Sequence, residues 1–472
     1  MFPELFPKGA RLTDARTGQS WAQTDICDQA TRKSEVLTQI GVGRSCICIV
    51  ATPNAADALF WLFGVWDLDG IAVLVNPGVS EFERTNIIET TSAQVWIDED
   101  GPNLLTSLSK TEPIGHSGLD APALVLMTSG TTGVPKGIVH TRRGLHARAD
   151  LNIAHIGAGT MRASLCVLPV FFGHGLIGNC LTPLMAGAHV VLWASPSPVE
   201  INGFADLLRK YRITFMSSVP TFWKMATRMS AKIDNQLERI HVGSAPLSIE
   251  QWEAIADWCG TRSVWNLFGM TETANWIGGG ALDDSKARDG YVGTIWGGRY
   301  AVGDENGAVR ASGTGEVLVR SPTIMTEYLG QPQATAEAFH GDWFRTGDIG
   351  ELDEKGALWL VGRTKFEINR GGLKVQAEEI DMMLERHPDV TEACAFGIPD
   401  RAAGEAVAAA IVLSPQASEQ FDSAKVLQWC RTQVRAEAVP ARLFVVDAIA
   451  RNERGKIRRS KVRDQFVVAE RD

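Results

Sequence analysis

Short apolar runs rich in valine, isoleucine and leucine recur along the first 290 residues of the chain. They lie at Cys46–Ala51, Ile71–Val75, Ala93–Ile97, Leu124–Met127, Val190–Leu192 and Arg239–Val242, and a helix-like stretch, Ala55–Trp66, separates the first two. Runs that are apolar throughout are typical of strands buried on both faces, and their alternation with helices is typical of βαβ units. We therefore predict an α/β fold whose large N-terminal domain has parallel-rich sheets flanked by helices.

The pattern changes near Gly290. Short strands broken by glycine and aspartate follow at Gly315–Arg320, Ile349–Leu352 and Leu358–Val361, which predicts a β-rich subdomain. Beyond residue 364 a small α+β unit begins, with predicted helices at Ala377–Arg386 and Ser423–Val434 and strands at Thr391–Phe396 and Ala406–Leu413. We predict two domains, an N-terminal core over 1–364 and a small, mobile C-terminal domain over 365–472.

The stretch from Ala163 to Val199 contains no Asp, Glu, Lys or Arg. It is longer than the roughly 20 residues that span a bilayer. Pro169, Gly173 and Pro183 interrupt it, however, and its pattern favours a strand, a loop, a helix and a strand in a buried core. We predict no membrane span, and the first residues lack the basic and apolar regions of a secretory signal.

The composition narrows the class of protein further. Apolar residues make up 45% and charged residues 21% of the 472 residues, as in ordinary globular proteins. A net charge of -9 argues against a nucleic-acid partner, which would favour a basic face. The eight cysteines are scattered and form no paired zinc motif, so we expect reduced, buried thiols in a cytoplasmic protein.

A loop of small residues carries the clearest chemistry. The apolar run Leu124–Met127 leads directly into Thr128–Gly137, which is rich in glycine and hydroxyl residues and contains Lys136. Glycines let the backbone approach a ligand, and backbone N–H groups, hydroxyls and a lysine can surround phosphate oxygens. It is not a Walker loop, because Lys136 lies between Pro135 and Gly137. By composition alone, a segment of this kind is usually a turn or linker.

The order of residues in this loop resembles the signature loop of the adenylate-forming superfamily, which contains acyl-CoA synthetases, peptide-synthetase adenylation domains and firefly luciferases. Other segments resemble that family's motifs in the same order, from Cys46 to Arg459. They are the adenine turn Gly243–Pro246, the adenine and magnesium motif Asn266–Thr273, the ribose segment Trp343–Asp348, the hinge Gly362–Lys365, the glycine loop Arg370–Val375 and the catalytic-lysine loop Asn452–Ile457.

The resemblance assigns a role to each matching residue. It implies ATP and Mg²⁺ as cofactors, with Glu272 holding the metal and Thr271 and Lys456 taking part in catalysis. The implied ATP and AMP contacts are Thr128, Ser129, Gly130, Thr131, Thr132, Gly133, Lys136, Gly243, Ser244, Ala245, Asn266, Leu267, Phe268, Gly269, Thr271, Asp348, Arg363 and Lys456. Phe268 stands where most members have tyrosine, which keeps a surface for stacking on adenine. Without the resemblance, Asp348 would be read as a turn residue and Lys456 as a solvated charge.

Two further sets of residues concern the acceptor and the acid. Lys365 is implied as the pivot of the hinge, and Gly371, Gly372 and Lys374 as the lining of a thiol tunnel. Phe366 departs from the family, which usually has an acidic residue after the pivot, and Ala377 stands where it often has proline. The predicted acid pocket is aromatic and free of charge, which suits a flat or apolar acid, and its run resembles benzoate-type CoA ligases. Its members are Phe171, Phe172, His174, Val219, Gly269, Met270 and Trp276, with Pro220 and Phe222 nearby.

His174 has two interpretations, a catalytic residue beside the carboxylate or a packed histidine at the start of a helix. The predicted function is ATP-dependent conversion of a carboxylic acid, aromatic or small and apolar, to an acyl-AMP, followed by transfer to a thiol, with CoA the favoured acceptor. The alternatives are loading of a carrier-protein phosphopantetheine, transfer to a nitrogen acceptor, and a non-catalytic nucleotide sensor. The sequence does not indicate the oligomeric state.

Overall fold

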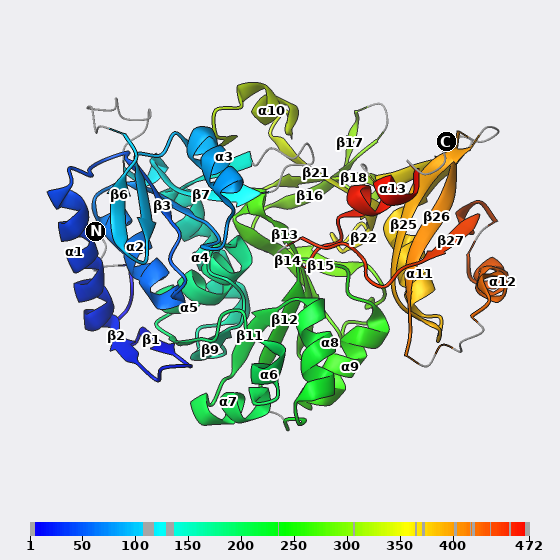
Figure 1. Cartoon of the computed structure of the whole chain (residues 1–472), viewed down its shortest axis with the longest axis horizontal. Helices are drawn as coiled ribbons and strands as arrows, with labels where there is room; N and C mark the ends of the chain where they lie inside the picture. The colour runs from blue at the N-terminus through cyan, green and yellow to red at the C-terminus, as the bar shows by residue number, and fades with distance from the viewer. Residues whose placement is uncertain are drawn as a thin grey trace. The chain divides into compact units, whose positions relative to one another are not determined.

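The structure is a computed structural model that describes residues 5–106, 118–128, 136–234, 236–304, 307–363, 366–370, 373–400, 404–415, 417, 421–434, 436–452 and 455–467. The chain divides into two compact units (Figure 1). The first comprises residues 1–288, 292–299 and 319–344, and the second comprises 289–291, 300–318 and 345–472. The predicted division into 1–364 and 365–472 stays a prediction, since residues 364 and 365 lie outside the described part.

A seven-stranded sheet forms the first layer of unit 1, in the order β19-β8-β7-β4-β3-β5-β6. The parallel strands are β3 (Ile47–Val50), β4 (Ile71–Leu74), β5 (Val95–Asp98) and β7 (Pro122–Thr128). The antiparallel strands are β6 (Gly101–Leu104), β8 (Lys136–Thr141) and β19 (Glu327–Tyr328). All four residues of β3 and of β4 are buried, as expected of strands covered on both faces.

Helices α1 (Gln23–Gln39), α2 (Ala55–Asp67), α3 (Glu81–Thr91) and α4 (Arg142–Ile156) belong to this part of the unit. Helix α2 is apolar apart from Asp57 and Asp67, and Asn54 caps its start, with a side chain that accepts a hydrogen bond from Asp57 N. Gly64 marks the place where α2 packs closely on α1. A Cβ at Gly64 would lie 2.7 Å from the Cβ of Lys33, so a larger residue would push the helices apart.

The second sheet of unit 1 has a parallel centre made of β1 (Arg11–Asp14), β10 (His189–Leu192), β9 (Ala163–Cys166), β11 (Phe215–Ser218), β12 (Arg239–Gly243) and β13 (Val264–Met270). The antiparallel strands β2 (Ser20–Ala22) and β14 (Asn275–Ala281) flank this centre, and β15 (Tyr291–Ile295) pairs with β14. The accompanying helices are the π-helix η3 (His174–Leu181), α5 (Thr182–Met185), α6 (Pro198–Ile201), α7 (Phe204–Tyr211), α8 (Pro220–Met229) and α9 (Ile249–Cys259). Helix α10 (Pro332–Glu337) and strand β20 (Phe339–His340) complete the unit.

Unit 2 is built mainly of antiparallel strands. One group comprises β16 (Arg299–Gly303), β17 (Val309–Arg310), β18 (Gly313–Arg320), β21 (Trp343–Leu352) and β22 (Leu358–Arg363). A five-stranded sheet follows, with β23 (Glu367–Arg370), β24 (Leu373–Gln376), β25 (Val390–Asp400), β26 (Gly404–Leu413) and β27 (Arg442–Val445). Side chains of α11 (Ala377–Glu385) and α12 (Ser423–Gln433) share one apolar cluster with this sheet, and Val462 of α13 (Arg459–Val467) belongs to another.

The predicted fold class is confirmed, and the predicted strands and helices occur with small changes at their ends. The largest change concerns Ile349–Leu352, which is the end of a ten-residue strand that starts at Trp343. The uncharged stretch forms β9, η3, α5 and β10, as predicted. Among the described residues, no helix combines the length and apolar character needed to cross a membrane. All eight cysteines are free, and seven of them are buried.

Candidate active site

The predicted phosphate loop joins two paired strands of unit 1. Thr128 ends β7 and Lys136 begins β8, and the two residues are opposite each other in the antiparallel ladder. The hydroxyl of Thr128 donates to the carbonyl of Lys136 at 3.4 Å. Ser129, Gly130, Thr131, Thr132 and Gly133 lie outside the described residues. The structure therefore places the two ends of the loop side by side at one end of the sheet.

His140, further along β8, ties this strand to the predicted magnesium motif. Its Nε2 lies 2.8 Å from the carbonyl oxygen of Thr271, and its side chain is buried, at 1% exposure. Burial lowers the pKa of His140 to about 4, so the ring is neutral near pH 7. Because a carbonyl can only accept, Nε2 carries the hydrogen. Strand β8 begins at Lys136, and the buried hydrogen bond of His140 ties the same strand to Thr271.

Strand β13 and the turn that follows it present the adenine and magnesium motif. The ladder between β13 and β14 shifts between Phe268 and Gly269, and a Cβ at Gly269 would lie 2.2 Å from the carbonyl oxygen of Asn275. Only glycine fits at this shift. Asn266 and Phe268 are each 4% exposed, so the Phe268 ring offers little free surface and its stacking on adenine stays a prediction.

Glu272 lies in a short 3-10 turn, Thr271–Thr273, directly after β13. The hydroxyl of Thr273 accepts from the backbone N–H of Met270 at 3.0 Å, which fixes the start of the turn. Thr271 and Glu272 are half-buried. The carboxylate of Glu272 accepts a hydrogen bond of 3.1 Å from the hydroxyl of Tyr328 at Oε1.

The adenine turn contacts the predicted acid pocket through His174. Gly243 ends β12, and Ser244 follows it with a positive φ of 69°. The Oγ of Ser244 lies 2.9 Å from Nδ1 of His174, and Nε2 of the same ring lies 2.6 Å from the Oγ of Ser217. Ala245 is half-buried beside them in the chain. One residue assigned to the nucleotide and one assigned to the acid are therefore in direct contact.

His174, the first residue of η3, contacts one aromatic side chain of the predicted acid pocket. The Trp276 ring meets it edge-on at a centroid distance of 5.4 Å, and the rings of Phe171 and Phe172 contact each other at 4.5 Å. Val219 precedes α8 and Met270 ends β13, and both are half-buried. His174 is a helix-start residue and a neighbour of the nucleotide turn, and its catalytic role stays a prediction.

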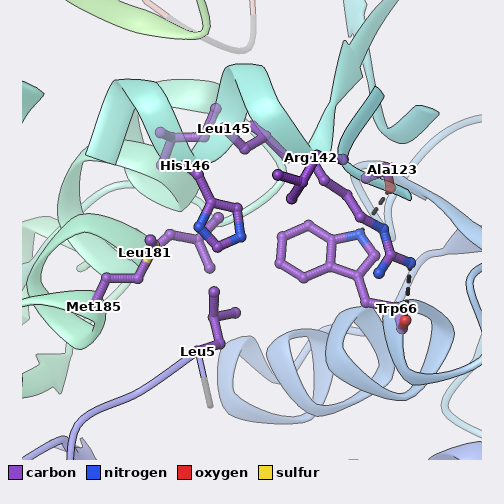
Figure 2. A pocket seen from close by; sticks show the side chains of 10 residues that line it. Leu5, Trp66, Ala123, Arg142, Leu145, His146, Leu181 and Met185 are labelled. Carbon is purple, nitrogen blue, oxygen red and sulfur yellow. Dashed lines mark hydrogen bonds between the residues drawn. The ribbon is translucent and has the colours of Figure 1, made fainter. Parts of the chain in front are cut away.

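A separate apolar cavity of about 240 Å³ lies elsewhere in unit 1 (Figure 2). Its walls are formed by Leu5, Trp66, Leu119, Ala123, Arg142, Leu145, His146, Ile177, Leu181 and Met185, and they include none of the predicted acid-pocket residues. Trp66 Nε1 donates to the carbonyl of Ala123, and Arg142 donates to the carbonyl of Trp66 and pairs with Asp69. These polar groups of the wall are engaged with the protein itself.

The predicted ribose-binding pair lies in unit 2. Asp348 is in the middle of β21, with 3% exposure, rather than in a turn. Arg363 ends β22 and is opposite Asp348 in the ladder. The Arg363 Nε lies 2.7 Å from Asp348 Oδ1. The structure thus brings together the two side chains that the resemblance places at the ribose.

Lys456 is exposed on a tight loop between Arg451 and Ile457, which form an isolated antiparallel bridge. Its backbone N–H donates to Asn452 Oδ1 at 3.0 Å, and its carbonyl accepts from Asn452 N at 2.9 Å. Arg451 donates to the carbonyl of Gly455 and to the carboxylate of Glu392, each at 2.7 Å. The loop that holds Lys456 is therefore fixed at its base.

The remaining predicted residues are only partly described. Lys365, Gly371 and Gly372 lie outside the described residues, and Lys374 is described only as part of strand β24. Sequence reasoning missed Ser217, His140 and Tyr328, which contact three predicted site residues. Each is a single polar residue in or beside a strand, and no motif marked it.

Known proteins and protein families match most of the chain. A family model described as AMP-binding enzyme matches residues 6–329, and one described as AMP-binding enzyme C-terminal domain matches residues 379–456. The chain is 32% identical over 440 residues to a probable CoA ligase, CCL9, of Humulus lupulus, covering 89% of this chain and 83% of that protein. It is 34% identical over 366 residues to an oxalate–CoA ligase of Arabidopsis thaliana, covering 76% and 70%. The structure of ATP-bound MatB from Rhodopseudomonas palustris matches with a TM-score of 0.87, 24% identity and 98% coverage of both chains.

Proposed function

Because the chain belongs to the AMP-binding enzyme family, within the adenylate-forming superfamily that its motifs resemble, we propose that it is an acid–thiol ligase. It uses ATP to convert a carboxylic acid to an acyl-AMP with release of pyrophosphate, and then passes the acyl group to the thiol of CoA with release of AMP. The observation that carries the proposal is the contact of His174 with Ser244 and Trp276. It joins the aromatic wall of the acid pocket to the turn assigned to adenine, as a reaction between an acid and a nucleotide requires.

The single carboxylate of Glu272 fits a magnesium ion that arrives with the nucleotide. No cluster of three or more His, Cys, Asp or Glu side chains that could hold a metal occurs among the described residues. Mg²⁺ is commonly held by one or two carboxylates together with waters and substrate phosphates. Glu272 would supply one such carboxylate, and a bound Mg²⁺ would neutralise negative charge on the phosphates. Lys136 would add a positive charge from the end of the phosphate loop.

Lys456 is the proposed catalytic cation. The acid's carboxylate must approach an α-phosphate, and both groups are negative. An ammonium placed between them offsets the repulsion and stabilises the charge that develops during displacement. Asp348 would accept hydrogen bonds from the ribose hydroxyls, with Arg363 beside it.

The second half-reaction is proposed to use the small domain, residues 365–472, in another orientation. Rotation about Lys365 would remove Lys456 from the acyl-AMP and bring Gly371, Gly372 and Lys374 toward the thiol. A single lysine would then serve only the first step.

The acid is proposed to be aromatic or small and apolar. The support is the lining, in which Phe171, Phe172 and Trp276 present ring surfaces and His174 is the ionisable member of the predicted set. One relative is named for oxalate, which is a small dianion, so membership of the family does not by itself indicate an apolar acid. The argument for an apolar acid is the aromatic lining of the predicted pocket in this chain.

CoA is the preferred acceptor because two relatives at 32% and 34% identity are named CoA ligases. A carrier-protein phosphopantetheine has the same thiol and is the second candidate, and a nitrogen nucleophile is the third. A cytoplasmic location also stays a prediction.

The test is acid-dependent exchange of labelled pyrophosphate into ATP, run with aryl acids, alkyl acids and oxalate. Each active acid is then assayed with CoA, with a phosphopantetheinyl carrier protein, with an amine and with no acceptor. We expect exchange with benzoate-like acids and thioester formation with CoA. Nucleotide binding without exchange for any acid would support a non-catalytic nucleotide sensor instead. Formation of an amide in the absence of CoA would support a nitrogen acceptor.

A further inference from the structure

A short segment that no motif marked connects the phosphate-loop lysine to the predicted magnesium ligand. The backbone N–H of Met325 donates to the carbonyl of Glu272 at 2.7 Å. The N–H groups of Thr326 and Leu329 donate to the carbonyls of Val139 and Gly137 at 3.0 and 2.8 Å. We call residues 325–329 the strap. It bonds at one end to the turn of Glu272 and along its length to the strand that begins at Lys136.

Tyr328, in the middle of the strap, makes the same connection with its side chain. Its hydroxyl donates to Oε1 of Glu272 at 3.1 Å, and the Nζ of Lys136 lies 4.5 Å from the centroid of its ring. The residue is 9% exposed. A carboxylate oxygen can only accept, so the phenol donates this hydrogen bond.

The ring is held rigidly. Tyr328 N donates to the hydroxyl of Thr335 at 3.0 Å, and its side chain shares an apolar cluster with Ile138, Met325 and Phe344. The phenol is thus held between Glu272 and Lys136. Its hydroxyl engages one carboxylate oxygen of Glu272, and its face attracts an ammonium through the ring quadrupole.

We propose that Tyr328 is a positioning residue that orients Glu272 toward a nucleotide-bound Mg²⁺ and keeps Lys136 at the phosphates. This inference rests on the proposed function, in which Glu272 is a magnesium ligand. With Oε1 held by the phenol, the carboxylate cannot rotate freely and its second oxygen is presented in one direction. The lysine and the carboxylate are thereby kept on a common support, although more than 130 residues separate them in the chain.

The experiment measures ATP binding by calorimetry, in Mg²⁺ and in a chelator. Tyr328→Phe keeps the ring and removes the hydroxyl, so we expect ATP affinity to fall about 5- to 10-fold in Mg²⁺ and less than about 2-fold without it. Tyr328→Leu also removes the ring face, and we expect a further loss of about 3-fold that persists in the chelator. Tyr211→Phe is the matched control, because Lys210 lies 4.8 Å from the Tyr211 ring, remote in sequence from the motifs.

The remaining outcomes separate the two hypotheses. Wild-type affinity of Tyr328→Phe in Mg²⁺, or an equal loss with and without Mg²⁺, overturns the role of Tyr328. Wild-type affinity of Glu272→Gln in Mg²⁺ overturns the proposed role of Glu272 itself. If Glu272→Gln weakens binding and Tyr328→Phe does not, only the inference about Tyr328 is lost. The double variant with both Tyr328→Phe and Glu272→Gln should bind MgATP no more weakly than Glu272→Gln alone. If the losses of affinity in the two single variants add up in the double variant, the proposal is contradicted.

Discussion

At the scale of single residues, the chemistry of this chain depends on a few polar groups whose surroundings decide their charge and direction. Lys456 is exposed but held on a loop fixed by Arg451 and Asn452. His140 is buried and neutral. Asp348 is buried in a strand and paired with Arg363. Lysine, histidine and aspartate often have purely structural roles in proteins. The neighbours of these three residues indicate specific roles, which substitutions can test.

Replacing Lys456 by Ala should lower acyl-AMP formation by at least about 100-fold, since the variant lacks the cation that offsets two negative groups in the transition state. Thioester formation from synthetic acyl-AMP should fall less than about 3-fold, because Lys456 is proposed to serve only the first step. Both rates can be measured by quenched flow. Lys461→Ala, another exposed lysine of unit 2, is the control. Equal loss in both half-reactions would contradict the proposed division of labour.

His140 should make the stability of the protein pH-dependent. Its ordinary pKa is 6.5 and burial lowers it to about 4, so above pH 6.5 the ring is neutral in both the folded and the unfolded chain. Between pH 6.5 and 4 the unfolded chain binds the proton first, and the free energy of unfolding decreases. His140→Gln cannot titrate, and its amide can still donate to the carbonyl of Thr271. We expect the decrease in unfolding free energy from pH 7 to pH 5 to be smaller by about 2 kcal/mol in this variant, measured by urea unfolding. An unchanged decrease would contradict the neutral assignment.

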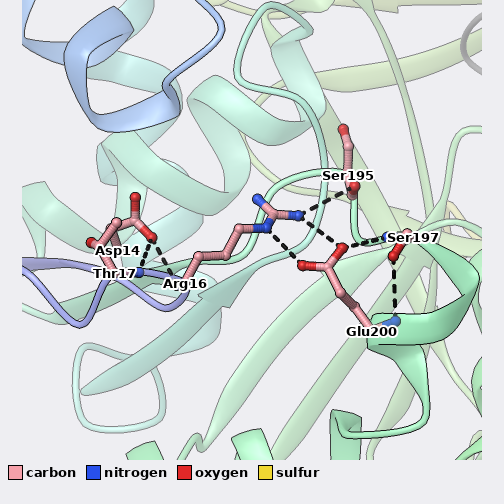
Figure 3. Close-up of polar contacts among 6 residues, drawn as sticks. All are labelled: Asp14, Arg16, Thr17, Ser195, Ser197 and Glu200. Carbon is pink, nitrogen blue, oxygen red and sulfur yellow. Dashed lines mark hydrogen bonds and ion pairs between the residues drawn. The ribbon is translucent and has the colours of Figure 1, made fainter.

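At the scale of secondary-structure elements, the buried strands could be predicted because their cause is local. β3 and β4 are apolar throughout, and burial on both faces requires that composition. The hairpin β1–β2 could not be predicted, because its strands have four and three residues and its partner lies far along the chain. Arg16 in its turn donates to the carboxylate of Glu200 and to the carbonyl of Ser195, as Figure 3 shows. The strap escaped prediction for the same reason, since β19 has two residues.

The packing of α1 against α2 gives a prediction in which two effects oppose each other. Gly64→Ala should stabilise helix α2 by about 1 kcal/mol from propensity alone. The added Cβ, however, would lie 2.7 Å from Lys33 Cβ and 3.0 Å from the backbone N of Ser34, neither of which can move without shifting α1. Overpacking of this kind costs about 1–3 kcal/mol, so we expect a net loss of up to about 2 kcal/mol in chemical unfolding. Gly43→Ala, whose Cβ would meet nothing within 4 Å, should change stability by less than about 0.5 kcal/mol. A gain in stability at Gly64 would show that the helices yield.

At the scale of the whole molecule, the sequence motifs indicate the chemistry well but do not predict the geometry that assembles the site. The apolar strand before the phosphate loop was predicted and is the part of β7 that ends at Thr128, whereas the second strand, which begins at Lys136, was not predicted. The contact of His174 with Ser244 joins residues 70 positions apart and depends on how two βα units pack. Sequence periodicity contains no information about such packing. The motifs therefore indicate what reacts, and the fold determines which supporting residues hold it.

The proposed two-step cycle places its largest demand on residue 365, where the small domain is expected to turn. Proline fixes φ near −65° and removes the backbone N–H, so Lys365→Pro should restrict rotation at this residue while leaving the catalytic groups of both predicted domains intact. We expect acid-dependent pyrophosphate exchange to stay within about 3-fold of wild type and thioester formation from acyl-AMP and CoA to fall by at least about 100-fold. Single-turnover assays of the two half-reactions measure this, with Lys365→Ala as the control that keeps the rotation free. Full thioester formation by Lys365→Pro would show that the chain does not turn at residue 365, and the proposed boundary between 1–364 and 365–472 would then have to move.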